Sequence, residues 1–307
     1  MSSSLSQISV LIPVYQCADL LPAHLDFLTT LSGRVHELIW VITDSPDGSC
    51  RMAKAAASKM GGKILEVPRG LYEAWNAGIA HATGEFLYIS TVGDFMERHD
   101  GLDILLNVLR KTRADLVTSP PIIQAWKKEI RAMTQHWPLF VFEKFMSLYD
   151  HHVIPREKAA VLQILSGASG LVGSCASCLF RTSILQKFPF PCEHFHYGDT
   201  AWLYLHMPEI AIAYSRIPVA RFEVHDLTMH RTIHKGQIYT LMKALGGAFP
   251  DSLESHVNEL VTANEQIDLI RDPHPRYGWW FSYKAWYFRA IRQRHRRQLQ
   301  KYLRCGF

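Results

Sequence analysis

The side chains best suited to chemistry on a charged ligand occur in four short polar segments of this sequence. Each segment follows a short apolar run, and the four are marked by Pro13, Asp44, Arg69 and Asp94. A carboxylate can hold a divalent cation, and an arginine can bind phosphate oxygens. If the apolar runs are parallel strands, their carboxyl ends meet at one edge of a sheet. The sequence therefore predicts one polar site built from four separated stretches.

Residues 69–94 show how such side chains would be positioned. Apolar residues between Leu71 and Ala82 recur at steps of three and four, which indicates a helix. Thr83-Gly84 ends that helix, because glycine tolerates the left-handed conformation of a C-terminal cap. Residues 85–91 form a short apolar run with aromatic and β-branched members, typical of a strand buried on both faces. Asp94 therefore follows the carboxyl end of a strand.

The same alternation continues on either side of this stretch. We expect further strands at residues 8–12, 37–43, 63–67 and 115–118, and helices at residues 20–31, 51–60 and 102–111. Pro13 is expected to end the first strand, since proline cannot donate to the ladder. This order predicts an α/β fold in which helices flank a mostly parallel, twisted sheet on both faces.

Glycine-rich phosphate loops are absent from the sequence. Neither G-x-G-x-x-G after the first strand nor G-x-x-x-x-G-K occurs. We therefore expect phosphates to be held by a divalent cation on Asp94, helped by Arg69, since Mg²⁺ is commonly held by one or two carboxylates plus substrate phosphates.

Three ordered motifs between Ile8 and Phe95 carry a resemblance to a known family. They read ISVLIPVYQCADLLPAHLDFL, LIWVITDSPDGS and RGLYEAWNAGIAHATGEFLYISTVGD. The last is similar to the pattern G-x-Y-[DE]-A-x-N-x-G-I, followed by A-x-G-E and a closing acidic pair, of family 2 glycosyltransferases with the GT-A fold. A looser match covers residues 174–225 and includes Gly198-Asp199 and His225.

The resemblance implies transfer of a sugar, with inversion, from a nucleotide-diphosphate donor to a glycan or lipid-linked acceptor. A UDP-sugar is the expected donor, and synthesis of a surface polysaccharide is the expected setting. The residues implied to bind the nucleotide-sugar are Pro13, Val14, Tyr15, Asp44, Arg69 and Gly93. Asp94 and His225 are implied ligands of a divalent cation, Mg²⁺ or Mn²⁺. Asp199 is the implied general base, which takes the proton of the acceptor hydroxyl.

The family pattern often has two acids where this chain has one. The three single-acid positions are Thr43-Asp44, Gly93-Asp94 and Gly198-Asp199. One carboxylate holds Mg²⁺ only when phosphates and water complete the shell, so we expect weaker metal binding. The pattern leaves open a catalytically weak or inactive nucleotide-sugar-binding protein of the same fold. A nucleotidyltransferase is disfavoured, because it would need a glycine- and lysine-rich loop after the first strand.

Five of the predicted site residues also have a plainer interpretation. Asp94 and Asp199 could cap the helices that follow them, and Asp44 could start a turn. Arg69 could be a solvated loop charge, and His225 a packed or surface histidine.

A zinc site is a further alternative. Cys175-x-x-Cys178, followed by Cys192, His194 and His196, contains suitable ligand types. Residues 174–180 read as a strand, however, in which side chains three positions apart face opposite sides. We therefore do not expect zinc.

Three parts of the chain are predicted. Residues 1–118 form the nucleotide-sugar-binding half of a GT-A domain, residues 119–230 its acceptor-binding half, and residues 231–307 a helical C-terminal extension. Acceptor specificity is expected in residues 120–170, which contain several aromatic side chains and the cluster Asp150-His151-His152.

Positive charge is concentrated in the C-terminal tail. The formal net charge is +5, yet no acidic residue follows Asp272, and eight Lys and Arg residues occur between Lys284 and Arg304. Aromatic residues lie among them, so residues 278–307 are either an element for an anionic membrane surface or a packed helix with a solvated basic face. No nucleic acid partner is expected. The six cysteines and the polar start MSSSLSQ favour a cytoplasmic protein, with attachment to the cytoplasmic face of a membrane through this tail.

Overall fold

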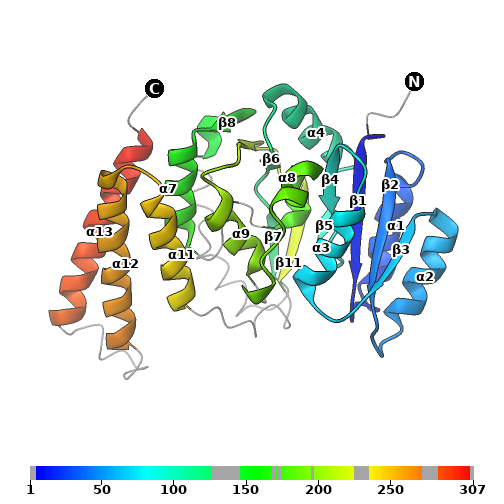
Figure 1. Cartoon of the computed structure of the whole chain (residues 1–307), viewed down its shortest axis with the longest axis horizontal. Helices are drawn as coiled ribbons and strands as arrows, with labels where there is room; N and C mark the ends of the chain where they lie inside the picture. The colour runs from blue at the N-terminus through cyan, green and yellow to red at the C-terminus, as the bar shows by residue number, and fades with distance from the viewer. Residues whose placement is uncertain are drawn as a thin grey trace.

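The computed structural model describes residues 5–125, 146–167, 171, 174–194, 197–224, 235–271 and 283–304. These residues form an eight-stranded sheet with the order β3-β2-β1-β4-β9-β6-β10-β8 (Figure 1). Its strands are β1 (Ile8–Val14), β2 (Glu37–Thr43), β3 (Lys63–Val67), β4 (Phe86–Ile89), β6 (Leu116–Thr118), β8 (His152–Ile154), β9 (Cys178–Arg181) and β10 (Ile212–Tyr214). β8 and β9 run antiparallel to their neighbours, and the other pairs are parallel. The predicted mostly parallel sheet is confirmed.

Helices cover both faces of this sheet, as predicted. One face carries α1 (Leu21–Leu31), α2 (Ser49–Met60) and α4 (Gly101–Thr112), and the other carries α3 (Leu71–His81), α7 (Arg156–Ser166), α8 (Thr182–Lys187) and α9 (Gly198–His206). Strand β1 shows why both faces need a covering layer, since successive side chains of a strand point to opposite faces of the sheet. Val10 and Ile12 pack with Leu21, whereas Leu11 packs with Trp75 on the other face. Each such buried side chain contributes roughly 1.5–3 kcal/mol relative to an exposed one.

Pro13 does not end β1, contrary to the prediction. The strand continues to Val14, and Pro13 is paired in register with Val41 of β2. On the other side, the ladder with β4 ends at Leu11. Pro13 thus has a strand partner on one side only, and a missing N–H is tolerated there.

A second, three-stranded sheet stands beside the end of β4. It has the order β5-β11-β7, with β5 (Phe95–Met96), β11 (Ala220–Val224) and β7 (Ile122–Ala125). Because β5 begins directly after Asp94, the turn that carries this carboxylate is held between the two sheets.

The C-terminal extension is helical, as predicted. It consists of α11 (Lys235–Gly247), α12 (Asp251–Arg271) and α13 (Tyr283–Arg304), at the left of Figure 1. α11 contacts α9, and α13 contacts α7. Leu299 and Leu303 of α13 are buried in the same core cluster as Trp202 of α9. In the described part of the chain, none of the helices has both the length and the apolar character needed to cross a bilayer.

The strand predicted for residues 174–180 is only partly correct. Residues Cys175–Ser177 form a turn of 3₁₀ helix, and β9 starts at Cys178. The turn begins where the Ser174 hydroxyl accepts a hydrogen bond from the Ala176 N–H at 3.2 Å, a local bond that competes with strand pairing. The argument from strand geometry therefore does not apply to Cys175 and Cys178. Cys175 and Cys178 are buried free thiols, and the described residues contain no group of three or more metal-ligating side chains. His196 lies outside the described residues.

Candidate functional site

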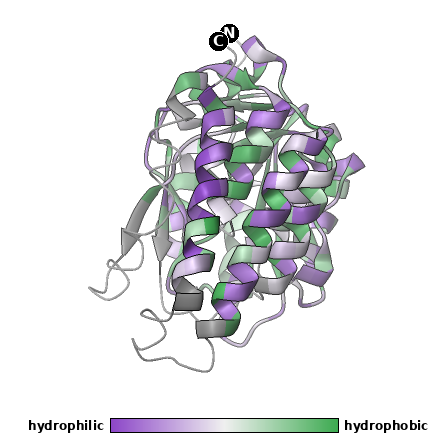
Figure 2. Cartoon of the chain, turned by 90° about the vertical axis from the view of Figure 1, so that its left-hand side faces the viewer, coloured by the Kyte–Doolittle hydropathy of each residue, from purple (hydrophilic) through white to green (hydrophobic). Residues whose placement is uncertain are grey.

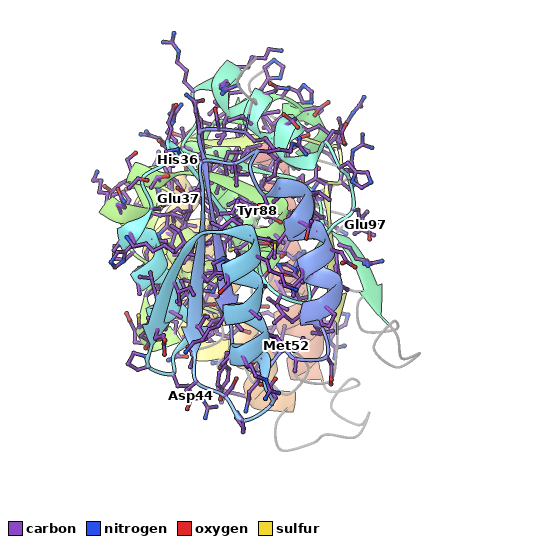
Figure 3. All side chains as sticks on the ribbon, turned by 90° about the vertical axis from the view of Figure 1, so that its right-hand side faces the viewer. His36, Glu37, Asp44, Met52, Tyr88 and Glu97 are labelled. Carbon is purple, nitrogen blue, oxygen red and sulfur yellow. The ribbon has the colours of Figure 1, made fainter. Side chains whose placement is uncertain are left out.

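Polar loops follow the parallel strands at one edge of the main sheet. Figure 3 shows this edge at the bottom, where Asp44 follows β2, whereas Glu37, the first residue of β2, lies toward the opposite end. In the neighbouring loops, the Arg69 guanidinium lies over the Tyr15 ring, with 5.3 Å between Cζ and the ring centroid. This contact joins the loop after β1 to the loop after β3. The predicted meeting of these two loops at one edge of the sheet is present.

The other residues predicted to bind the nucleotide-sugar differ in which of their groups a ligand could reach. Val14 is only 1% exposed and its side chain belongs to the core, so only its backbone could reach a ligand at this edge. Pro13 is half-buried, while Asp44 and Arg69 are exposed. The side chains of Asp44 and Arg69 are therefore accessible to solvent. Pro13 and Val14 end β1 and support the loop that follows it.

Asp47 fastens the first two loops together. Its Oδ2 accepts a hydrogen bond from the Ala18 N–H at 2.9 Å, and its Oδ1 accepts from the Ser49 N–H at 3.1 Å and from the Ser49 and Ser45 hydroxyls at 2.7 and 3.0 Å. Burial alone would raise the pKa of Asp47, but these hydrogen bonds outweigh it and lower the pKa to about 2. The sequence suggests only a turn here, because the Ala18 partner is remote along the chain.

Asp94 lies in a tight turn at the end of β4. Its N–H donates to the Thr91 carbonyl oxygen, and its Oδ2 accepts hydrogen bonds from the Thr91 and Ser174 hydroxyls, both at 2.8 Å. The next helix, α4, begins at Gly101 with Asp100 at its N-cap. The interpretation of Asp94 as a helix cap is therefore wrong.

A buried histidine supports this turn from inside. His24 of α1 is 1% exposed, and its Nε2 lies 2.9 Å from the Ser90 hydroxyl oxygen at the end of β4. Burial lowers the pKa of His24 to about 4, so the ring is neutral at physiological pH. Nothing in the sequence distinguishes His24 from the other fifteen histidines, because its role depends on a contact across 66 residues.

Asp199, the predicted base, is the second residue of α9. Its Oδ1 accepts a hydrogen bond from the Tyr72 hydroxyl at 3.1 Å and from the Thr200 N–H at 2.8 Å. The N-cap position belongs to Tyr197, so Asp199 is not the N-cap residue. A carboxylate in the first turn is nevertheless favoured by the positive end of the helix dipole.

Cys175 connects the surroundings of Asp94 and Asp199. Burial raises the pKa of its thiol well above the usual value, and the negative charges of Asp199 and Asp94 raise it further. The thiol therefore stays protonated, close enough to both carboxylates to be influenced by each. Two acids that lie 105 positions apart in the sequence thus both act electrostatically on one buried thiol.

The structure also gives reasons for the three missing acids. Thr43 is 5% exposed, so a carboxylate at that position would be buried. Gly93 has a φ of +106°, a conformation that favours glycine. A Cβ at Gly198 would lie 2.5 Å from Cε2 of the Tyr72 ring. Each position disfavours a second acid for a local reason.

The donors around Asp94 fit a cation that a ligand helps to hold. One carboxylate with two neighbouring hydroxyls is a hard-oxygen environment of the kind that Mg²⁺ and Mn²⁺ accept. The described residues contain no cluster of three or more His, Cys, Asp or Glu side chains suited to a metal, so phosphate oxygens and water would have to complete the shell. His225, the other predicted ligand, lies outside the described residues.

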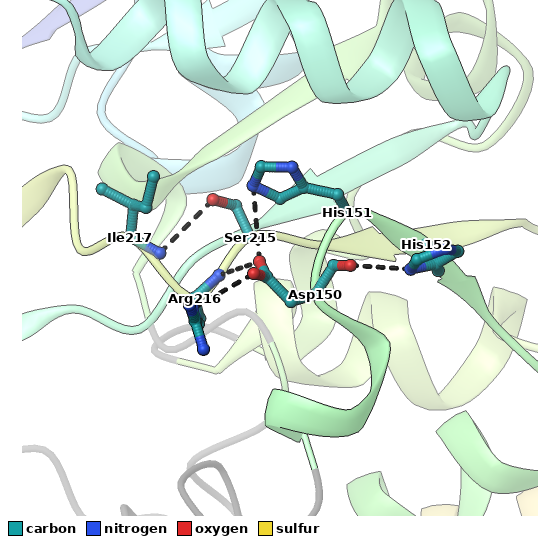
Figure 4. A network of polar contacts seen from close by, with 6 residues as sticks. All are labelled: Asp150, His151, His152, Ser215, Arg216 and Ile217. Carbon is teal, nitrogen blue, oxygen red and sulfur yellow. Dashed lines mark hydrogen bonds and ion pairs between the residues drawn. The ribbon is translucent and has the colours of Figure 1, made fainter.

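The cluster Asp150-His151-His152 lies beside β10 and β8, the last two strands in the order of the main sheet, and Figure 4 shows its polar contacts. Asp150 Oδ1 accepts from the Arg216 N–H at 3.0 Å, and Oδ2 lies 3.2 Å from Arg216 Nε. His151 Nε2 is 3.4 Å from Asp150 Oδ1, and His152 Nδ1 is 2.7 Å from the Asp150 carbonyl oxygen. Asp150 therefore fastens the segment before β8 to the segment after β10, at the same edge as Asp94.

The hydrogen bond from the Ala18 N–H to Asp47 predicts that this amide is protected from hydrogen exchange. In Asp47→Ala, hydrogen exchange of the Ala18 N–H should speed up by roughly three- to ten-fold, a value discounted for the exposure of this carboxylate. The folded pKa of Asp47 is depressed below the unfolded value, so the protection should be complete above about pH 4 and should decline as the pH falls toward 2. Asp19→Ala, which removes an exposed acid from the same loop, is the control. Equal exchange in both variants would contradict the tie.

Comparison with known proteins gives one family match and several structural likenesses. Residues 9–186 match the family described as Glycosyl transferase family 2. A comparison with curated proteins finds no match. Among solved structures, residues 1–349 of S. aureus TarS, in complex with UDP-GlcNAc, share 12% identity at a TM-score of 0.59, covering 97% of this chain and 91% of that one.

A second structural likeness is glucosyl-3-phosphoglycerate synthase from Mycobacterium tuberculosis, in complex with Mn²⁺, UDP and glucosyl-3-phosphoglycerate. It shares 17% identity at a TM-score of 0.52, covering 80% of this chain and 81% of that one. At such identities these likenesses establish the fold, which is of the GT-A type. The family match spans more than half of the sequence, and the chain therefore belongs to glycosyl transferase family 2.

Proposed function

We propose that this chain transfers a sugar from a nucleoside diphosphate donor, expected to be a UDP-sugar, to a hydroxyl acceptor with inversion at the anomeric carbon. The observation that carries the proposal is that Asp94 accepts a hydrogen bond from Ser174, the residue directly before Cys175, and the charge of Asp199, from a separate part of the chain, acts on that same buried thiol. The structural likenesses support the choice of donor, since TarS is crystallised with UDP-GlcNAc and the mycobacterial synthase with UDP and Mn²⁺ or Mg²⁺.

The loops after β1, β2 and β3 would hold the nucleotide. Arg69 lies over one face of the Tyr15 ring and can bind phosphate oxygens, while the other face of the ring is the one proposed to stack on a base. Asp44 is exposed at the same edge and can accept hydrogen bonds from base or ribose. Gly93 and the backbone at Pro13 and Val14 would line the base of the nucleotide site. Residues 1–118 would thus form the donor half and residues 119–230 the acceptor half.

Asp94 would hold a divalent cation together with the diphosphate, and His225 is the further ligand we propose. When bound, such a cation neutralises the charge that develops on the leaving diphosphate. The hydroxyls of Thr91 and Ser174 keep the Asp94 carboxylate in place.

Asp199 would act as the general base. The acceptor oxygen bonds to the anomeric carbon, the bond from that carbon to the diphosphate oxygen breaks, and the acceptor proton passes to the Asp199 carboxylate. A glycan or a lipid-linked sugar is the acceptor class we propose, in the synthesis of a surface polysaccharide. Asp150 and the segments it joins lie at the same edge as Asp94 and would help to shape the acceptor side.

The exposed face of α13 is the proposed contact with an anionic membrane. Trp286 and Tyr287 are 62% and 49% exposed, and the exposed basic side chains are Arg294, Arg297, Lys301 and Arg304. Figure 2 views this side of the molecule, where hydrophilic residues are prominent on the helices in front. Leu299 and Leu303 anchor the opposite face in the core. Exposed aromatic residues beside cationic ones suit the headgroup layer of anionic lipids, at the cytoplasmic face.

The first test of this function concerns the metal. Asp94→Asn should abolish the Mn²⁺-dependent part of UDP binding in calorimetric titration and leave the melting temperature nearly unchanged, because the amide oxygen can still accept a hydrogen bond. Asp103→Asn on α4 is a matched control at a distance. Unaltered UDP titration in Asp94→Asn would remove Asp94 from the site.

The second test concerns the base. A thermal-shift panel of nucleotide-sugars with Mn²⁺ selects the donor, since specific binding stabilises by mass action. UDP release from that donor, with water as the acceptor, should then fall by about a hundred- to ten-thousand-fold in Asp199→Asn, with donor affinity little changed. A parent protein that binds the donor but never releases UDP would instead favour the non-catalytic binding protein.

The third test concerns the membrane. The triple variant Arg294→Gln, Arg297→Gln, Lys301→Gln should weaken binding to phosphatidylserine-containing vesicles by on the order of a hundred-fold at low salt, and added salt should weaken the parent's binding. The control removes three exposed charges elsewhere, as Lys59→Gln, Lys63→Gln, Lys111→Gln. Equal binding by the two triple variants in flotation would show that α13 is not the membrane contact.

A further inference from the structure

Tyr72 and Asp199 come from opposite parts of the chain and meet in the site. Tyr72 is the second residue of α3, and its hydroxyl donates to Asp199 Oδ1 at 3.1 Å across 127 positions. Burial raises the pKa of the Tyr72 hydroxyl well above its usual value, and the charge of Asp199 raises it further. The hydroxyl is therefore protonated at neutral pH and remains a hydrogen-bond donor to the carboxylate.

The Tyr72 ring is held in one orientation by aromatic neighbours. It is 2% exposed, lies edge-on to Trp75 at 5.3 Å and packs against Phe190 at 5.8 Å. Asn76, one turn further along α3, fixes Phe190 in turn. Its side-chain amide donates to the Phe190 carbonyl oxygen at 2.8 Å and accepts from the Phe190 N–H at 2.9 Å. The hydroxyl is thus presented by a ring with little freedom to move.

Gly198 provides the space that this arrangement needs. A Cβ at this position would lie 2.5 and 2.6 Å from Cε2 and Cδ2 of the Tyr72 ring and 2.8 Å from the Pro191 carbonyl oxygen. Only glycine lets the ring approach the first turn of α9 so closely. The missing side chain at Gly198 therefore makes room for the Tyr72 ring, and this room allows the Tyr72 hydroxyl to reach Asp199.

We propose that Tyr72 is a positioning residue for Asp199, holding through its hydroxyl the carboxylate that takes the proton from the attacking oxygen. The inference rests on the proposed function, in which Asp199 is the base. With water as the attacking group, the water oxygen bonds to the anomeric carbon, UDP leaves with the electrons of the broken carbon–oxygen bond, and the proton passes to Asp199. Tyr72 keeps its own proton throughout.

The test compares two variants that each remove one buried hydroxyl. Tyr72→Phe keeps the ring and its packing, and kcat for UDP release from the selected UDP-sugar should fall about ten- to a hundred-fold, the range expected for a hydrogen bond to a charged group. KM and the affinity for UDP with Mn²⁺ should change less than about three-fold. Tyr204→Phe, on α9 itself, removes a buried hydroxyl that donates to the Gln163 and Gly167 carbonyl oxygens, and its kcat should stay near that of the parent.

A double-mutant cycle separates positioning from a merely structural role. If Tyr72 acts through Asp199, Tyr72→Phe should cost little in the Asp199→Asn background, because the carboxylate it positions is already gone. Gly198→Ala offers a second perturbation, since it displaces the ring while the hydroxyl remains, and it should lower kcat without abolishing UDP binding. Thermal melting checks that each variant is folded.

The outcomes distinguish this inference from the proposed function. An active parent in which Tyr72→Phe keeps the parent's kcat, or in which its loss is equally large with and without Asp199, overturns the role of Tyr72 and leaves the proposed function standing. A parent that releases no UDP from any donor overturns the proposed function, and the positioning role with it. A loss of kcat that depends on Asp199 supports both.

Discussion

The site depends on the packing of one face of α3 against the segment that leads into α9. Asn76 pairs with both backbone groups of Phe190, and Tyr72 reaches Asp199. These are part-buried polar contacts, and each would leave an unsatisfied group if the two segments separated. They join an early segment of the chain, where the nucleotide loops lie, to a later one that carries the proposed base. The short helix α3 therefore fixes where the proposed base lies relative to the nucleotide loops.

Two of the single-acid positions hold glycine, and the packing around α3 accounts for one of them. Gly198 has no side chain because the Tyr72 ring occupies its space, and Gly93 has none because its backbone is left-handed. The acids that remain, Asp94 and Asp199, are each held by neutral hydroxyl donors. A site built in this way keeps its geometry without a second carboxylate and relies on the ligand's phosphates for part of any metal shell.

The C-terminal helices show how one element can be both core and surface. α13 buries Leu299 and Leu303 against the body while Arg294 and Arg297 face solvent. Helical spacing makes the two faces compatible, because residues three and four apart share a side. The described part of the tail is thus a packed helix with a solvated basic face, and its contact with an anionic membrane stays a prediction.

The sequence alone predicted most strands of the main sheet, its mostly parallel direction and the meeting of the loops that contain Tyr15 and Arg69, because strand patterning and the rule that parallel strands end at one edge are local or topological. It also singled out Asp94 and Asp199 through motif resemblance, while their roles and that of His225 stay predictions. It failed where the outcome depended on contacts between distant segments: Pro13 inside β1, the 3₁₀ turn at Cys175, the Asp47 tie to Ala18 and His24 beneath Ser90. Only the tertiary structure decided that Tyr72 meets Asp199, because that contact requires a specific close approach at Gly198, which no periodicity or motif spacing encodes.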